Sequence, residues 1–252
     1  MILEKFRIDG KVAAVTGGTK GLGKAIVLGL AEAGADIATV SRTPNPDLEK
    51  AVLRFGRRYI HHAADLTHRE QTKAVIPGIL EKMGDVDILV NNAGIIRRSP
   101  TVDYSEGDWD ATLEIDLTAA FILSQAAGKM MLKKGNGKII NIASILAFQG
   151  GVNVVGYTAA KHGLTGLTKA LANEWASRGV NVNAIAPSFF VTPFTEAIQK
   201  DTERSKSIIE RTPAKRWGNP ADIAGAVVFL ASAASDFLHG VVLPVDGGWM
   251  AW

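Results

Sequence analysis

Two residues with complementary chemistry, Tyr157 and Lys161, lie four positions apart, so a helix would carry the phenol and the ammonium on one face. A free tyrosine has a pKa near 10 and is a poor base at neutral pH. A nearby ammonium favours the phenolate and lowers this pKa toward the working range. Ser144 follows a predicted strand, and its hydroxyl can hold an oxygen that gains charge. These three groups suit hydride transfer at a carbon bearing oxygen, with Tyr157 as general acid or base.

A glycine-rich segment, Thr16–Gly23, comes directly after the first predicted strand and opens the first predicted helix. Glycines there allow a tight turn and let a pyrophosphate approach the free N–H groups of the helix N-terminus. Ordinary turns also contain such glycines, so the position between strand and helix is what favours a nucleotide site. The expected cofactor contacts in this segment are Gly17, Thr19, Lys20, Gly21, Leu22 and Gly23.

The second predicted strand ends at Ser41 and Arg42, with no acidic side chain to hold the ribose hydroxyls of NAD. Arg42 and Lys20 are instead two cations suited to a 2′-phosphate. We therefore expect Ser41 and Arg42 to contact the cofactor, with NADP(H) favoured and NAD(H) possible. The alternative is that both cations are solvated surface residues.

Short apolar runs alternate with longer segments of helical periodicity along the whole chain. The predicted strands are Val12–Thr16, Asp36–Ser41, Tyr59–Ala63, Val86–Val90, Lys138–Ala143, Val180–Ala186 and Val241–Val245. The predicted helices are Gly21–Ala33, Asp47–Phe55, Arg69–Met83, Asp110–Lys134, Val155–Ser177 and Pro220–Ala233. This alternation predicts an α/β fold with a doubly wound parallel sheet (Rossmann fold) of about seven strands and helices on both faces. We expect one dinucleotide-binding and catalytic domain over residues 1–252.

The polar segment 188–220 interrupts the alternation between the sixth strand and the last helix. A long excursion at this point is often a lid over a binding crevice. An ordinary pair of surface helices is the other interpretation.

Composition narrows the class of protein further. The chain has 252 residues, 47% of them hydrophobic, a formal charge of +3 and no cysteine. The charge excess is small and unclustered, so we expect no nucleic-acid or membrane partner. The absence of cysteine excludes disulfides and thiolate metal sites. His61, His62 and His68 have no ligand spacing, so no metal is expected. No secretory signal precedes Gly10, which predicts a cytoplasmic protein.

The chain resembles the short-chain dehydrogenase/reductase family, classical branch. Thr16–Gly23, Asn91–Gly94, Ser144, Tyr157 and Lys161 match its motifs, and the resemblance extends to Val245-Asp246-Gly247-Gly248. It implies that Tyr157 and Lys161 also contact the cofactor, with Lys161 on the nicotinamide ribose. It implies further contacts from Asp65 and Leu66 beside the adenine, from the backbone of Asn92, Ala93 and Gly94, and from the Pro187–Thr192 turn through Phe190 and Thr192. A homotetramer with a four-helix interface from the Asp110–Lys134 and Val155–Ser177 helices is also implied.

Within this family several segments resemble the 2-dehydro-3-deoxy-D-gluconate 5-dehydrogenases, with the gluconate 5-dehydrogenases nearly as similar and other keto reductases as alternatives. They are Asn91–Arg98, Asp108–Asp110, Phe148–Gly151 and Asn173–Trp175. This resemblance implies a small-molecule sugar-acid substrate. Arg97 or Arg98 is a candidate anchor for its carboxylate, and a surface salt bridge or subunit contact is the alternative role.

Three positions depart from the family pattern. Asp116 stands where the family has an asparagine that supports a water relay to the lysine, and an ionised Asp116 would favour the charged form of Lys161. Ser188 replaces a glycine, which is tolerated only without positive φ. Thr192–Thr195 replaces an asparagine-rich segment. Asp116 is kept as a candidate catalytic residue. A non-enzymatic dinucleotide-binding protein is the remote alternative.

Overall fold

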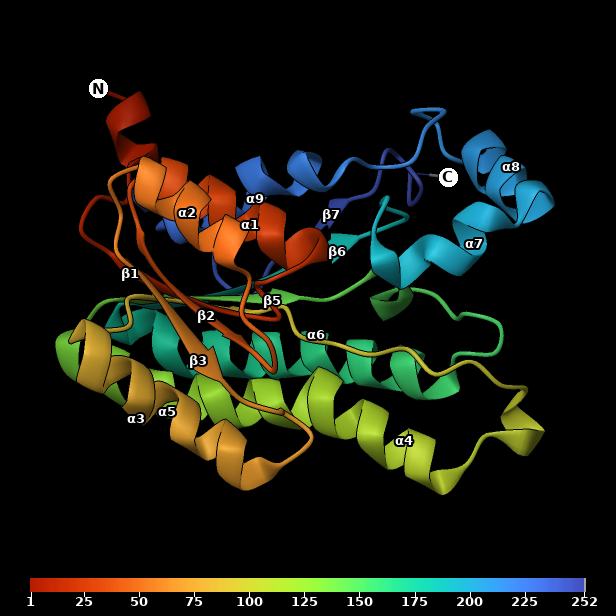
Figure 1. Ribbon diagram of the computed structural model, residues 1–252, viewed down its shortest axis with the longest axis horizontal. Helices are drawn as coiled ribbons and strands as arrows, with labels where there is room; N and C mark the ends of the chain where they lie inside the picture. Colours follow the sequence, from red (N-terminus) through yellow and green to blue (C-terminus); the bar gives the residue numbers. More distant parts are fainter. Residues whose placement is uncertain (252) are drawn as a thin grey trace.

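The structure is a computed structural model that describes residues 1–251, so Trp252, the last residue of the predicted domain, lies outside the described residues. Its centre is a parallel sheet of seven strands in the order β3-β2-β1-β4-β5-β6-β7 (Figure 1). Neighbouring strands pair in register, for example Val15 of β1 with Thr39 of β2 and with Val90 of β4. The strands are β1 (Val12–Thr16), β2 (Asp36–Ser41), β3 (Tyr59–Ala63), β4 (Ile88–Asn91), β5 (Gly137–Ile142), β6 (Val180–Pro187) and β7 (Val242–Val245).

The apolar runs of the sequence become strands because helices cover both faces of the sheet. Every residue of β1, β4, β5 and β6 is buried, whereas the edge strands β3 and β7 are partly exposed. A strand buried on both sides needs apolar residues at successive positions rather than alternate ones. The predicted doubly wound α/β fold is therefore confirmed.

Two helical layers enclose the sheet (Figure 1). One layer holds α1 (Gly21–Glu32), α2 (Pro46–Arg54) and α9 (Ala224–Ala231), and the other holds α3 (Arg69–Met83), α4 (Glu106–Leu113), α5 (Ala119–Lys134) and α6 (Val155–Trp175). Each layer buries its own apolar cluster against the sheet. Gly29 of α1 lies so close to Ala224 of α9 that a Cβ on the glycine would come within 2.8 Å of the alanine Cβ. Within residues 1–251 no helix is both long and apolar enough to span a bilayer.

The predicted helix Asp110–Lys134 is wrong in its start and in its continuity. The Ser105 side chain caps α4 by accepting a hydrogen bond from the N–H of Asp108 (3.1 Å), so helix begins at Glu106. A π-helical turn, Glu114–Thr118, then separates α4 from α5. Such turns insert one residue into the helical ladder and are frequent at functional sites.

The predicted helix Pro220–Ala233 also divides. Asn219 caps a 3₁₀ turn, Pro220–Ile223, and α9 follows it and ends at Ala231. Segment 188–220 contains two short helices, α7 (Glu196–Lys200) and α8 (Thr202–Arg211), which lie together at one end of the molecule (Figure 1). The helical pair considered for this segment is thus present.

Candidate active site

A cleft of about 710 Å³ opens at the carboxyl edge of the sheet, where β1 and β4 lie side by side and the strand order reverses. Ligands of open α/β sheets bind at this kind of position. The structure brings most of the expected site residues into its walls, namely Gly17, Lys20, Gly21, Leu22, Gly23, Asn92, Ala93, Gly94, Asp116, Ser144, Tyr157, Lys161, Pro187, Phe190 and Thr192. Thr19, Ser41, Arg42, Asp65 and Leu66 lie outside the lining of this cleft.

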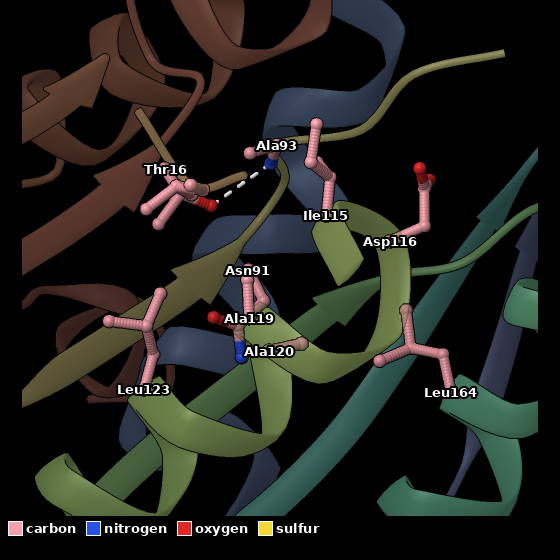
Figure 2. Close-up of a pocket in the computed structure, with 10 residues that line it drawn as sticks. Thr16, Asn91, Ala93, Ile115, Asp116, Ala119, Ala120, Leu123 and Leu164 are labelled. Carbon is pink, nitrogen blue, oxygen red and sulfur yellow. Dashed lines mark hydrogen bonds between the residues drawn. The ribbon is translucent and has the colours of Figure 1, made fainter. Parts of the chain in front are cut away.

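The glycine-rich turn is tied to the end of β4 by side chains. The Thr16 hydroxyl oxygen accepts hydrogen bonds from the N–H groups of Asn92 and Ala93, both at 2.9 Å; Figure 2 shows the bond to Ala93. The Asn92 amide donates to the carbonyl oxygens of Thr16 (2.8 Å) and Gly17 (3.2 Å). Only backbone contacts were expected of Asn92, so its side-chain role in shaping the turn was missed. No sequence signal beyond its place after a strand indicates that role.

Three glycines have steric reasons to be glycine in this turn. Gly17 and Gly21 have φ of 62° and 53°, in the left-handed region that L side chains avoid. A Cβ on Gly23 would collide with the carbonyl oxygen of Gly17. The turn is therefore closed against α1 without side chains, which leaves a cradle for a phosphate at the N-terminus of that helix.

The predicted 2′-phosphate cations lie on the surface beside this turn. Arg42 is 75% exposed, and its Nη1 is 3.9 Å from Oδ2 of Asp65. The N–H of Thr67 and, more weakly, Arg42 hold the pKa of Asp65 below its usual value despite partial burial. An exposed pair at this distance contributes little to stability, so the Arg42 guanidinium is available to another anion. The Thr19 hydroxyl donates to Ser41 (3.2 Å), which joins the turn to the end of β2.

Lys161 and Asp116 form a buried ion pair at the floor of the cleft. Nζ of Lys161 lies 2.9 Å from Oδ1 of Asp116, with side-chain exposures of 4% and 0%. The same Nζ donates to the carbonyl oxygen of Ile142 (3.0 Å) and lies 5.3 Å from the centroid of the Tyr157 ring. Oδ2 of Asp116 accepts from the N–H of Ile95 (2.9 Å). Strand β5, helix α6 and the π-helical turn together position this group.

The Lys161 contact with Oδ1 of Asp116 is close but poorly aligned, so this oxygen accepts no regular hydrogen bond. The contact is therefore an ion pair. Beneath the π-helical turn lies a cavity of about 10 Å³, whose walls include Asp116, Asn91 and Leu123 (Figure 2). Because Asp116 lines both this cavity and the cleft, it forms part of the wall between them.

Burial raises the pKa of Asp116, although Lys161 and the N–H of Ile95 act against the rise. Burial alone would lower the pKa of Lys161, but the charges of Asp116 and Tyr157 outweigh it and raise this pKa. The pKa of Tyr157 is raised as well, first by burial and then by Asp116, against the lowering effects of Lys161, Ser144 and Arg98. The lowering effect expected of Lys161 is present, but burial and Asp116 outweigh it. At neutral pH the phenol carries its proton.

The turn after β6 accommodates its departure from the family pattern. Ser188 is absent from the positive-φ residues of the described chain, and its hydroxyl donates to the carbonyl oxygen of Asp246 (3.0 Å). The serine is therefore unstrained. Farther along, the Phe194 ring lies 5.9 Å from the Tyr157 ring between centroids, so the segment before α7 contacts the candidate catalytic side chain.

The two candidate carboxylate anchors differ. Nε of Arg97 lies 3.3 Å from Oδ1 of Asp108, which is the surface salt bridge considered as the alternative role. Arg98 also lines the cleft; its side chain is still open to solvent, and its partial burial is the first cause of its lowered pKa. Its charge acts on the phenol of Tyr157, so Arg98 lies at the reacting end of the cleft.

A family model described as enoyl-(acyl carrier protein) reductase matches residues 17–250. The chain belongs to the short-chain dehydrogenase/reductase family. It is 47% identical, over all of both chains, to 2-dehydro-3-deoxy-D-gluconate 5-dehydrogenase of Escherichia coli (strain K12).

Two solved structures of this family are also similar. The first is a putative NAD(P)-dependent gluconate 5-dehydrogenase from Beutenbergia cavernae with bound NADP at low occupancy. It shares 45% identity with a TM-score of 0.95, over 98% of this chain and 100% of that one. The second is a gluconate 5-dehydrogenase from Burkholderia cenocepacia in complex with NADP and tartrate, with 38% identity and a TM-score of 0.95 over 100% of both chains. The predicted family is confirmed, and with it oxidoreductase chemistry.

Proposed function

We propose that this short-chain dehydrogenase/reductase uses NADP(H) to interconvert a hydroxyl and a ketone of a sugar acid, as a 2-dehydro-3-deoxy-D-gluconate 5-dehydrogenase does. The observation that carries the proposal is the meeting of Ser144, Tyr157 and Lys161 in one cleft with the glycine-rich turn. Full-length identity of 47% to an enzyme of that name supports the substrate. Gluconate 5-dehydrogenase is the alternative, favoured by the two solved relatives.

The residues of the turn fit a dinucleotide. Side chains at Gly17 or Gly23 would meet neighbouring atoms and obstruct the cradle formed by Gly17, Gly21 and Gly23. The N-terminus of α1 favours an anion there. Arg42 and Lys20 would meet the 2′-phosphate, which supports NADP(H) over NAD(H). The remaining proposed cofactor contacts are Thr19, Leu22, Ser41, Asp65, Leu66, Asn92, Ala93, Gly94, Tyr157, Lys161, Pro187, Phe190 and Thr192.

A bound reduced nicotinamide cofactor would supply the hydride that reduction of the substrate carbonyl requires. Tyr157, protonated at neutral pH, donates its proton to the carbonyl oxygen as that oxygen gains charge. Ser144 donates a hydrogen bond to the same oxygen. Lys161 stays charged through Asp116 and stabilises the phenolate that forms. In the opposite direction Tyr157 acts as the base, which requires a higher pH.

Three further features complete the proposal. Arg98 holds the substrate carboxylate, since Arg97 is already paired with Asp108.

Residues 1–252 act as one domain, and the segment 188–220 serves as the lid of the cleft. The enzyme works in the cytoplasm as a homotetramer joined through α4, α5 and α6, where Phe121 of α5 is 44% exposed. Light scattering tests the tetramer, and a monomer would contradict it.

Turnover is tested by following absorbance at the nicotinamide band with keto-uronates, gluconates and both cofactors. We expect activity with a sugar acid and a higher rate with NADPH than with NADH. Tyr157→Phe should lower kcat by about 10³-fold, because the proton donor is lost, and leave cofactor affinity nearly unchanged. Cofactor binding without turnover of any carbonyl or alcohol would favour the non-enzymatic alternative. Equal activity of Tyr157→Phe and wild type would exclude Tyr157 as the acid.

A further inference from the structure

A second arginine, Arg204 of α8, lines the cleft together with Arg98. The two come from distant parts of the chain: Arg98 lies in the loop after β4, and Arg204 lies in the excursion after β6. They are close enough that the charge of Arg204 lowers the pKa of Arg98, as the second cause after partial burial. Two arginines from distant segments thus contribute to the lining of one cleft.

Neither of these two arginines has a carboxylate partner or a side-chain hydrogen bond within residues 1–251. The neighbouring cations of the cleft differ, because Arg97 pairs with Asp108 and Arg211 stacks on Trp249 at 4.0 Å. Both side chains are exposed, so water screens most of the repulsion between these like charges. A bound anion could pair with both, and a planar carboxylate suits the fork geometry of guanidinium groups.

We propose that Arg204 and Arg98 together bind the carboxylate of the substrate, so that the acid itself draws α8 onto the mouth of the cleft. This inference rests on the proposed function and adds to it a second, α8-borne specificity residue. The site lies at the reacting end of the cleft, because Arg98 also acts on Tyr157. It is therefore separate from the proposed 2′-phosphate contacts of Arg42 and Lys20.

The arrangement explains how the enzyme would prefer acids to neutral sugars of the same length. A neutral polyol leaves the two guanidinium groups without an anion, whereas a carboxylate bound by both offsets part of their charge and links the two segments. A charged hydrogen-bonded contact of this kind is typically worth a tenfold or larger change in affinity. Discrimination therefore depends on Arg204 as well as on Arg98.

The test uses the intact protein saturated with NADPH, which cannot react with an alcohol, and measures binding of D-gluconate and of D-glucitol by calorimetry. These probes differ at the first carbon, which is a carboxylate in one and a hydroxymethyl group in the other. We expect Arg204→Gln to weaken D-gluconate binding at least about tenfold and to leave D-glucitol binding unchanged. Arg98→Gln should have a similar effect. Lys206→Gln, on the same helix but outside the cleft lining, is the matched control and should change neither affinity.

Several results would overturn the inference. They are unchanged D-gluconate affinity in Arg204→Gln, equal weakening of both probes, and wild-type protein that binds the acid no better than the polyol. A loss in Arg98→Gln alone would leave α8 without the role proposed for it. Because the readout is binding, selective loss of the acid supports the inference even if turnover assays contradict the proposed function. Thermal melting curves of each variant exclude unfolding as the cause.

Discussion

The carboxylate of Asp116 lies 2.9 Å from the ammonium of Lys161, both side chains are almost wholly buried, and the ammonium lies 5.3 Å from the centroid of the Tyr157 ring. A family pattern with asparagine at this position has no such charge. The ion pair keeps Lys161 charged, but the carboxylate also raises the pKa of Tyr157. Asp116 is therefore a positioning residue with two opposing effects on Tyr157. It holds the Lys161 ammonium in place, and its own charge offsets part of the lowering effect of that ammonium on the Tyr157 pKa.

Asp116→Asn should shift the pH dependence of alcohol oxidation toward lower pH. Oxidation needs the phenolate, so kcat rises with pH through the pKa of Tyr157. The amide removes a negative charge that raises this pKa, while Lys161 keeps its bond to Ile142. We expect the acid limb of the kcat profile to move down by about one pH unit.

The groups whose charges act on Tyr157 are Lys161, Asp116 and Arg98. Asp116→Asn removes the Asp116 charge and with it an influence that raises the pKa of Lys161, so the shift is measured at pH values at which Lys161 remains charged. Glu114→Gln is the matched control, because Glu114 lies in the same π-helical turn but pairs with Arg69. Its profile should coincide with that of the wild type. An Asp116→Asn profile that stays in place or moves to higher pH would refute the electrostatic role.

The same ion pair predicts a stability effect. Lys161→Met leaves the Asp116 carboxylate buried without its partner and should lower the free energy of unfolding by about 3 kcal/mol. The double variant with Asp116→Asn should recover most of this loss, because no buried charge remains. Urea unfolding of the four proteins of the cycle measures both effects. Additive losses in the double variant would show that the two residues do not interact.

The Lys161→Met loss should also depend on pH. Burial already raises the pKa of Asp116 in the folded state, and removal of the ammonium removes an opposing influence. A carboxyl whose folded pKa is above its unfolded value favours folding below the unfolded pKa, and that contribution is lost as pH rises through the folded pKa. The variant should therefore be less destabilised at about pH 5 than at about pH 8. The reverse order would contradict the raised pKa of Asp116.

The sheet could be predicted from the sequence because strands buried on both faces need apolar residues at successive positions. These apolar runs form β1, β4, β5 and β6. Helix limits could not be predicted, since they depend on single side chains. Ser105 caps α4, so that helix begins at Glu106, four residues before the predicted start at Asp110. Asn219 caps a 3₁₀ turn at Pro220, where the start of an α-helix was predicted. The hydrogen bonds of such capping residues set the helix ends even where the apolar periodicity suggests a different limit. A single capping side chain is only a weak signal in the sequence.

In the candidate site, the types and spacing of Ser144, Tyr157 and Lys161 were sufficient to predict that they lie together. The lowering effect of Lys161 on the Tyr157 pKa was predicted, but the opposing effect of burial was not, because burial is a property of the folded chain. The ion pair of Asp116 depends on a π-helical turn that periodicity does not show. The approach of Arg204 to Arg98 depends on how a long excursion folds back, which no local pattern records.

Cofactor preference should depend on Arg42. Arg42→Asp replaces a cation beside the end of β2 with a carboxylate, which would repel a 2′-phosphate and accept ribose hydroxyls. We expect the ratio of kcat/KM for NADPH to that for NADH to fall by about 100-fold. Arg54→Gln removes a cation from the end of α2 and serves as the control. An unchanged ratio in Arg42→Asp would exclude Arg42 as the phosphate contact.

Cofactor affinity should depend on the absence of a side chain at Gly23. A Cβ there would collide with the carbonyl oxygen of Gly17 and would come within 2.6 Å of the Asn92 amide nitrogen. Relief of that clash must open the turn, so Gly23→Ala should weaken NADPH binding by at least about tenfold in a fluorescence titration. Gly225→Ala, in α9 with no heavy atom within 4 Å of the added Cβ, controls for the substitution itself and should bind NADPH normally. Wild-type affinity in Gly23→Ala would show that the phosphate does not need this closed turn.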